Sequence, residues 1–213
     1  GADEVSYSEE LKRVIPVIEG IRSCNNKILI SIDTTKSMVA KEAVEAGANI
    51  INDVSGLSFD NQMPETIAQL KVPVIIMHMK GNPSDMQENP KYKDLINEII
   101  TYFEEKINIA INTGIEREMI ILDPGIGFGK TVEHNFKILS ELNRFNNLEL
   151  PLLIGPSRKS FIGLTLDLPP EDRLDGTAAT VAVGVNNGAR IIRVHDVKNM
   201  KRVVIIADKI RNA

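Results

Sequence analysis

Acidic and amide side chains stand at the ends of several short apolar runs, where they could hold a ligand. Asp33, Asn52 and Asp123 each follow directly on such a run. Taken singly, a residue of this kind is a common turn former or helix N-cap. At equivalent strand ends, two carboxylates and an amide suit a ring that carries N–H donors and a carbonyl acceptor.

The segment after Asp123 is rich in glycine and ends in a lysine, GIGFGK at Gly125–Lys130. A phosphate-binding P-loop needs a glycine where Pro124 stands, and the glycines recur one residue too closely for the dinucleotide fingerprint. The composition of the loop has two interpretations. Its glycines could leave a flat backbone surface against which a ligand lies, or they could serve only the turn from strand to helix.

Two further groups of polar residues follow later apolar runs. Ser157–Ser160 (SRKS) places two cations and two hydroxyls together, although a solvated basic loop would have the same composition. Arg193 and His195 are two residues apart in the last apolar run, so we expect them on one face of a strand, pointing to the ligand end. Such a pair suits a diphosphate. His78 fits a core histidine or a ligand contact equally well.

The elements that must position these residues alternate between apolar strands and amphipathic helices. Strands are expected at about 28–32, 48–51, 72–77, 119–123, 151–154 and 190–194. Helices are expected at about 8–23, up to 46, and at 64–70, 94–112, 134–144, 172–185 and 198–211. Ser8 is the expected N-cap of the first helix, Pro16 should kink or shorten it, and the turn formers at 80–90 predict a loop.

Buried strands separated by helices indicate an α/β protein with a parallel sheet. Repeats of about thirty residues suit a (β/α)8 TIM barrel, which typically has about 250 residues, and an open doubly wound sheet is the alternative. The 213 residues supply roughly six of the eight βα units. We therefore expect a single domain over 1–213 that lacks the N-terminal first strand, its loop and the second strand.

Composition narrows the function classes. The net charge of −4 gives no basic excess for nucleic acid, and no apolar run is long enough to cross a membrane. Cys24 is the only cysteine, so we expect no disulfide and a cytoplasmic location. No residue pattern has metal-ligand spacing, so an all-protein metal cage is not expected. The residues alone point to a transferase or lyase acting on a phosphorylated heterocycle.

Seven short motifs follow one another along the chain: SIDTTK at 31–36, INDVSG at 51–56, MHMKGNP at 77–83, LDPGIGFGK at 122–130, GPSRKSFIG at 155–163, DGTAAT at 175–180 and RVHDV at 193–197. With these motifs in this order, the sequence resembles the dihydropteroate synthase family, the pterin-binding enzymes of folate biosynthesis that sulfonamides inhibit.

The resemblance implies a TIM-barrel transferase that joins p-aminobenzoate to 7,8-dihydropterin-6-ylmethyl diphosphate and releases diphosphate with the help of Mg²⁺. The implied pterin-binding residues are Asp33, Asn52, Met77, Asp123, Gly155, Lys159 and Arg193. Of these, Asp33, Asp123, Lys159 and Arg193 are implied as catalytic. Arg193 and His195 would bind the diphosphate, and Phe128, Lys159 and Ser160 would border the p-aminobenzoate. The family's metal-ligating asparagine lies in the first strand, so no metal ligand is expected in this chain.

Two alternatives share the same pterin slot. A methyltetrahydrofolate–corrinoid methyltransferase has no diphosphate to bind, which would leave Ser157–Ser160, Arg193 and His195 idle. A non-catalytic pterin-binding fragment would bind pterin diphosphate without turnover. The resemblance also implies a homodimer through the last helices, and Met200, Val203, Val204 and Ile206 fit either that contact or packing on the barrel.

Overall fold

The structure is a computed structural model that describes residues 5–81, 86 and 90–213. The predicted loop at 80–90 and the end of the motif at 77–83 therefore lie partly outside the described residues. The strands are β1 (Ser31–Asp33), β2 (Ile50–Asp53), β3 (Val74–Met77), β4 (Ile120–Asp123), β5 (Leu153–Ile154) and β6 (Ile191–Ile192). The α-helices are α1 (Tyr7–Cys24), α2 (Ser37–Glu45), α3 (Met63–Leu70), α4 (Leu95–Asn112), α5 (Val132–Ser140), α6 (Ser160–Leu166), α7 (Leu174–Asn186) and α8 (Val197–Arg211).

The chain divides into two compact units. Unit 1 comprises Gly1–His78 and Tyr102–Ile121, and unit 2 comprises Met79–Thr101 and Leu122–Ala213. Strands and helices alternate along the chain, as the sequence predicts, except that α6 and α7 follow one another without a strand between them. Among the described residues, no helix is both long and apolar enough to cross a membrane.

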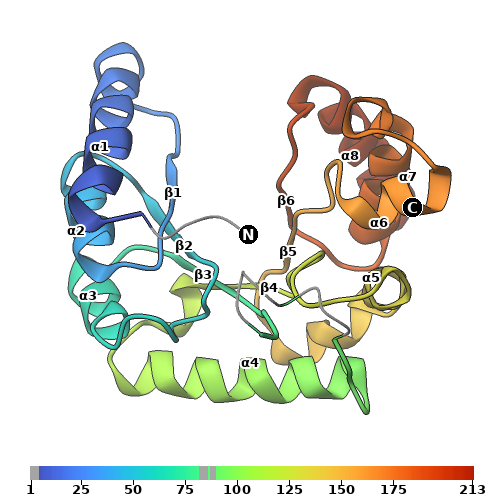
Figure 1. Cartoon of the computed structure of the whole chain (residues 1–213), viewed down its shortest axis with the longest axis horizontal. Coiled ribbons are helices and arrows are strands. Elements are labelled where there is room, and N and C mark those ends of the chain that lie inside the picture. Colours follow the sequence, from blue (N-terminus) through green and yellow to red (C-terminus); the bar gives the residue numbers. More distant parts are fainter. Residues whose placement is uncertain (1–4, 82–85, 87–89) are drawn as a thin grey trace. The chain divides into compact units, whose positions relative to one another are not determined.

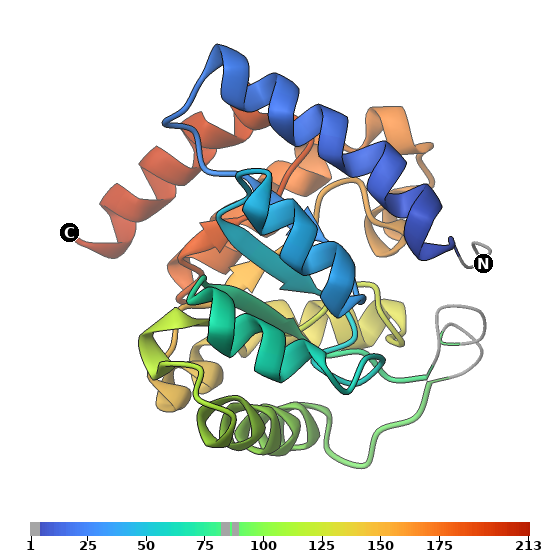
Figure 2. The ribbon, with the colours of Figure 1, turned by 90° about the vertical axis from the view of Figure 1, so that its left-hand side faces the viewer.

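Unit 1 is built on parallel strands β1, β2 and β3. The register places Asp33 of β1 opposite Asn52 of β2, and Ile51 opposite Val74 of β3. All four residues of β3 are buried, which is typical of a parallel strand covered on both faces. Helices α1, α2 and α3 lie on one side of these strands in Figure 1, and Figure 2 looks onto them.

The N-cap of helix α1 lies two residues before the predicted one. Ser6, not Ser8, is the N-cap, and its hydroxyl accepts a hydrogen bond of 3.3 Å from the backbone N–H of Glu9. The acidic residues Glu9 and Glu10 then fall in the first turn, where they complement the helix dipole. Pro16 lies within the helix and does not shorten it.

Unit 2 contains the parallel pair β5–β6, and Leu122 of β4 forms a parallel bridge to Leu152. Helices α7 and α8 lie side by side (Figure 1). Their contact is filled by the buried residues Val181, Val185, Met200 and Ala207. The small residues of α7 allow this close approach.

The structure of unit 2 differs from the sequence prediction in two element boundaries and one additional helix. The helix expected at 134–144 is α5 followed by a 3₁₀ segment, Leu142–Leu148. Helix α6 is absent from the sequence prediction, because Gly163 and the β-branched Ile162 and Thr165 are weak helix formers. The last strand ends at Ile192, so Arg193 and His195 lie beyond it rather than within it.

Candidate active site

In unit 1, the ends of β1 and β2 bring Asp33 and Asn52 together. The Asn52 side-chain Nδ2 donates a hydrogen bond of 2.8 Å to Asp33 Oδ1. Asn52 is buried, and its other polar atom, Oδ1, has no hydrogen-bond partner. A buried amide oxygen without a partner costs free energy in the free protein, so its position is suited to a ligand that brings an N–H donor. Met77, at the end of β3, is buried and apolar.

Neighbouring polar residues of unit 1 serve the fold. Asp53 accepts hydrogen bonds from Ser55 and from the Leu57 backbone N–H, which fixes the loop after β2. His78 is buried, and its ring meets the ring of Tyr102 edge-on at 4.9 Å. Of the two interpretations of His78, this packing favours the core histidine.

In unit 2, the glycine loop turns sharply after Asp123. Gly125, Gly127 and Gly129 have φ angles of 70°, 81° and 64°, which other residues rarely adopt. The Gly125 N–H donates to Asp123 Oδ1 at 2.7 Å, and the Gly127 N–H donates to Asn135 Oδ1 at 2.7 Å. The loop therefore needs its glycines, and the carboxylate at the strand end is fixed by the loop that follows it.

Asp123 is buried among cations. Burial raises the pKa of Asp123 to about 6, while the Gly125 hydrogen bond and the charges of Lys130, Lys159 and Arg193 oppose this rise. Lys130 is only 3% exposed, and burial lowers its pKa to about 7 against the attraction of Asp123. Burial also lowers the pKa of Lys159. This carboxylate can therefore stabilise positive charge on a ligand ring at neutral pH.

Phe128 and Lys159 meet over the glycine loop. The Lys159 ammonium lies 4.2 Å from the centre of the Phe128 ring, a cation–π contact. A Cβ at Gly127 would lie 3.1 Å from Lys159 Cδ, so the glycine makes room for the lysine stem. Ser160, the first residue of α6, is exposed. A Cβ at Gly155 would lie 3.8 Å from Arg193 Cβ, so Gly155 lies beside Arg193.

Ser157 holds His195 in place. The Ser157 hydroxyl lies 2.9 Å from His195 Nδ1 and accepts a hydrogen bond of 3.2 Å from the His195 backbone N–H. In the tautomer whose Nδ1 accepts the hydroxyl proton, the ring proton is on Nε2, from which it can be donated to an anion. Arg193 and His195 are both exposed, as an anion site open to substrate requires.

No group of three or more His, Cys, Asp or Glu side chains in the described part of the chain could hold a metal ion. The described residues therefore do not form a metal site by themselves.

Ser157 and Lys130 are site residues that the sequence does not single out. Ser157 belongs to the basic segment Ser157–Ser160, but its role depends on a contact with His195, 38 residues away. The sequence shows that a lysine closes the glycine loop, but the burial of Lys130 beside Asp123 leaves no local signal.

The comparisons with known proteins agree on one family. The model of the family "Pterin binding enzyme" matches residues 1–195. The dihydropteroate synthase of Synechocystis is 47% identical over 209 residues, which cover 98% of this chain and 72% of that protein.

Solved structures give the same result. A Yersinia pestis dihydropteroate synthase in complex with a sulfonamide drug has a TM-score of 0.96 at 41% identity, covering all of this chain and 77% of that one. A Xanthomonas albilineans dihydropteroate synthase with 4-aminobenzoic acid has a TM-score of 0.92 at 38% identity, covering all of this chain and 76% of that one. This likeness confirms a partial TIM-barrel fold and not the alternative, an open doubly wound sheet.

Proposed function

Because the chain belongs to the dihydropteroate synthase family of pterin-binding transferases, we propose that its strand-end residues bind the two substrates of that reaction. These are 7,8-dihydropterin-6-ylmethyl diphosphate and p-aminobenzoate. The observation that carries the proposal is the buried carboxylate of Asp123 at the end of β4, on which the positive charges of Lys130, Lys159 and Arg193 act.

Each unit, taken by itself, offers groups suited to a pterin. In unit 1, the unpartnered Asn52 Oδ1 and the Asp33 carboxylate offer acceptors for the N–H groups of the ring, and Met77 offers an apolar wall. In unit 2, Asp123 and Lys159 offer an acceptor and a donor, and Gly155 leaves a flat surface beside Arg193.

The chemistry follows from the charges. The C–O bond between the pterin methylene and the diphosphate breaks, and its electron pair leaves with the diphosphate. Asp123 stabilises the positive charge that develops on the pterin, while Arg193 and His195 bind the departing diphosphate. The lone pair of the aryl amine then forms the C–N bond, and the nitrogen loses a proton.

The second substrate needs positioning more than activation, because an aryl amine is weakly basic but neutral and nucleophilic at pH 7. Phe128, Lys159 and Ser160 are proposed to border it. The Mg²⁺ that this family implies would enter with the diphosphate oxygens, since Mg²⁺ commonly binds substrate phosphates with few protein ligands.

The test is formation of dihydropteroate from both substrates by the complete gene product. We expect one diphosphate released for each dihydropteroate formed. No product would contradict the proposal. Binding of pterin diphosphate by calorimetry without turnover would instead identify a non-catalytic pterin-binding protein.

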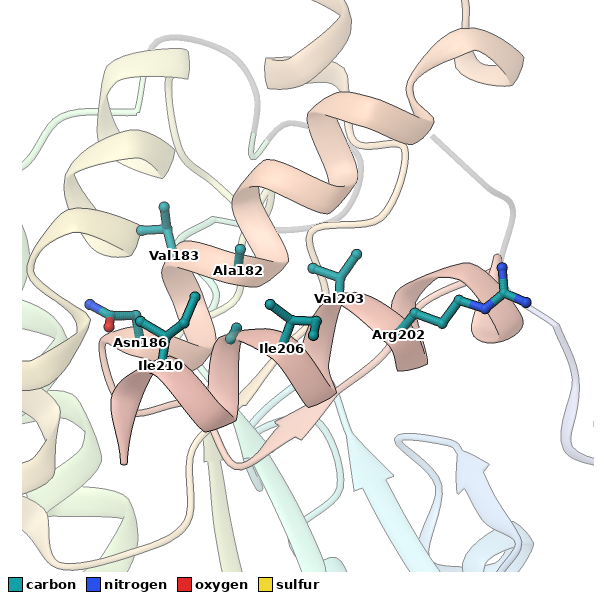
Figure 3. A pocket seen from close by; sticks show the side chains of 8 residues that line it. Ala182, Val183, Asn186, Arg202, Val203, Ile206 and Ile210 are labelled. Atoms are coloured by element: carbon teal, nitrogen blue, oxygen red, sulfur yellow. The ribbon is translucent and has the colours of Figure 1, made fainter. Parts of the chain in front are cut away.

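A separate surface of unit 2 supports the proposed homodimer. An apolar groove between α7 and α8 (Figure 3) is lined by Ala182, Val183, Asn186, Arg202, Val203, Ile206, Ala207 and Ile210. Ile206 and Ile210 are 62% and 68% exposed, which is unusual for side chains of this size on one helix face. Ile206→Glu should shift the molecular mass in light scattering towards the monomer, whereas Ile109→Glu on α4 should not.

A further inference from the structure

The glycine loop of unit 2 is held at its far end by a residue from another part of the chain. Lys130 Nζ donates to the Phe128 carbonyl at 2.9 Å, which is a contact within the loop. The Gly129 carbonyl instead accepts a hydrogen bond of 2.8 Å from the hydroxyl of Tyr92. Tyr92 precedes α4 and is 37 residues away in sequence.

Charged and aromatic groups hold the Tyr92 ring on two sides. The Lys80 ammonium lies 4.1 Å from the ring centre, and the His134 ring meets it edge-on at 5.0 Å. Lys80 is itself fixed by Glu98 at 3.0 Å and by the Lys91 carbonyl at 2.6 Å. Burial, with the charge of Glu98, raises the pKa of Tyr92, so its hydroxyl stays a donor at neutral pH.

Gly129 is packed closely against the backbone of Lys80. A Cβ at Gly129 would lie 2.1 Å from the Lys80 carbonyl oxygen, so the two backbones are in direct contact. Packing by Lys80 and the hydrogen bond from Tyr92 together determine where Gly129 lies. Phe128 is the preceding residue, so its ring position over Lys159 depends on the same contacts.

We propose that Tyr92 is a positioning residue for the aryl-amine substrate, acting through the Gly129 carbonyl to keep Phe128 over Lys159. This inference rests on the proposed function, which assigns Phe128 and Lys159 to that substrate. Asp123, at the other end of the loop, has its own contact with the Gly125 N–H and needs no support from Tyr92. The effect of Tyr92 should therefore fall on one substrate only.

The test is Tyr92→Phe, which keeps the ring and its contacts with Lys80 and His134 and removes only the hydroxyl. The Gly129 carbonyl then loses its donor, so we expect the KM for p-aminobenzoate to rise about tenfold. The KM for the pterin diphosphate should stay within about twofold of the unaltered protein. A general loss of stability would change the KM for both substrates. A rise in the KM for p-aminobenzoate alone therefore indicates a positioning role.

Two matched variants make the result interpretable. Tyr7→Phe alters an exposed tyrosine and should change neither constant. Tyr102→Phe removes a similar, partly buried hydrogen bond in unit 1, from its hydroxyl to the Met77 carbonyl at 3.1 Å. This variant should leave the KM for p-aminobenzoate unchanged.

The outcomes separate the two proposals. If the unaltered protein forms no dihydropteroate, the proposed function fails before any variant is made. If it is active and Tyr92→Phe raises both KM values equally, or neither, the positioning role of Tyr92 is overturned.

Discussion

Arg158 and Asp196 form a two-point ion pair in which Arg158 Nη2 lies 2.8 Å from Asp196 Oδ1 and Nε lies 3.0 Å from Oδ2. The pair joins the loop after β5 to the residue that follows His195. The Ser157 contact with His195 makes a second link between the same two segments. Arg158 thus serves the proposed anion site indirectly, by fixing the backbone that carries His195.

Arg158→Lys tests this link, because lysine keeps the charge and loses the planar fork that matches a carboxylate. We expect the KM for the pterin diphosphate to rise about threefold to tenfold, with p-aminobenzoate little affected. Steady-state kinetics with each substrate varied in turn measures this. Arg13→Lys, in the exposed pair with Glu9, is the control and should change nothing. Equal constants for Arg158→Lys and the unaltered protein would contradict the role.

Asn52→Leu should separate binding from stability. The change removes the unpartnered buried oxygen, which costs free energy in the free protein, together with the one hydrogen bond to Asp33. The free energy of unfolding should therefore change by less than about 1 kcal/mol, while the KM for the pterin diphosphate rises at least about tenfold. Urea denaturation and steady-state kinetics give the two values.

Asn49→Leu is the matched contrast within unit 1. The Asn49 side-chain oxygen accepts from the Ile30 backbone N–H and from Arg22, so both would lose a partner. This variant should lose about 1–3 kcal/mol of stability and keep its pterin affinity once folded. If Asn52→Leu is destabilised as much as Asn49→Leu, Asn52 is a structural residue and its assignment to the pterin fails.

The sequence predicts the strand ends well because burial and strand termination leave local signals. Asp33, Asn52 and Asp123 each stand at a change from apolar to polar residues. In the structure Asp33 and Asp123 are the last residues of β1 and β4, and Asn52 is the second-last residue of β2. Parallel pairing then puts Asp33 opposite Asn52 without further information. The family motifs add the substrates, which no local pattern supplies.

The parts of the fold and of the site that the sequence does not predict depend on contacts between residues far apart in the chain. Gly163 disfavours helix α6, but the Arg173 guanidinium packs against this position and would lie 2.2 Å from a Cβ there, so only glycine fits. The contacts of Tyr92 with Gly129 and of Arg158 with Asp196 likewise join segments far apart in sequence. Secondary-structure propensity and hydrophobic periodicity depend only on residues that are close in sequence. They therefore cannot predict these contacts between distant residues.

Lys130→Met should change the pH dependence of pterin use. Lys130 is one of the cations that oppose the rise in the pKa of Asp123, so its loss should raise that pKa further above about 6. The acid limb of kcat/KM for the pterin diphosphate should then move upward by about one pH unit. Lys137→Met on the exposed side of α5 is the control. An unchanged acid limb in Lys130→Met would show that the two charges do not interact.

Asp123 should make the stability of the protein and its binding of pterin change in opposite directions with pH. Because burial raises its pKa to about 6, from an ordinary value of 3.8, the folded protein holds this proton more tightly than the unfolded chain does. Between pH 4 and 6 the stability attributable to Asp123 therefore falls as the pH rises, by about 1–3 kcal/mol in all. Pterin binding should show the reverse trend, since it needs the ionised carboxylate and weakens as the pH falls through about 6.

Asp123→Asn keeps the acceptor for the Gly125 N–H and removes the titration. The difference in unfolding free energy between the variant and the unaltered protein should therefore change sharply between pH 4 and 6 and little between pH 6 and 7. Dihydropteroate formation should fall by at least about a hundredfold, because the neutral amide cannot stabilise a positively charged pterin. Urea unfolding at pH 4.5 and 6.5, with the exposed Asp172→Asn as control, measures the first effect. A constant stability difference across this range, or normal turnover in Asp123→Asn, would remove Asp123 from its role as the ionised pterin anchor.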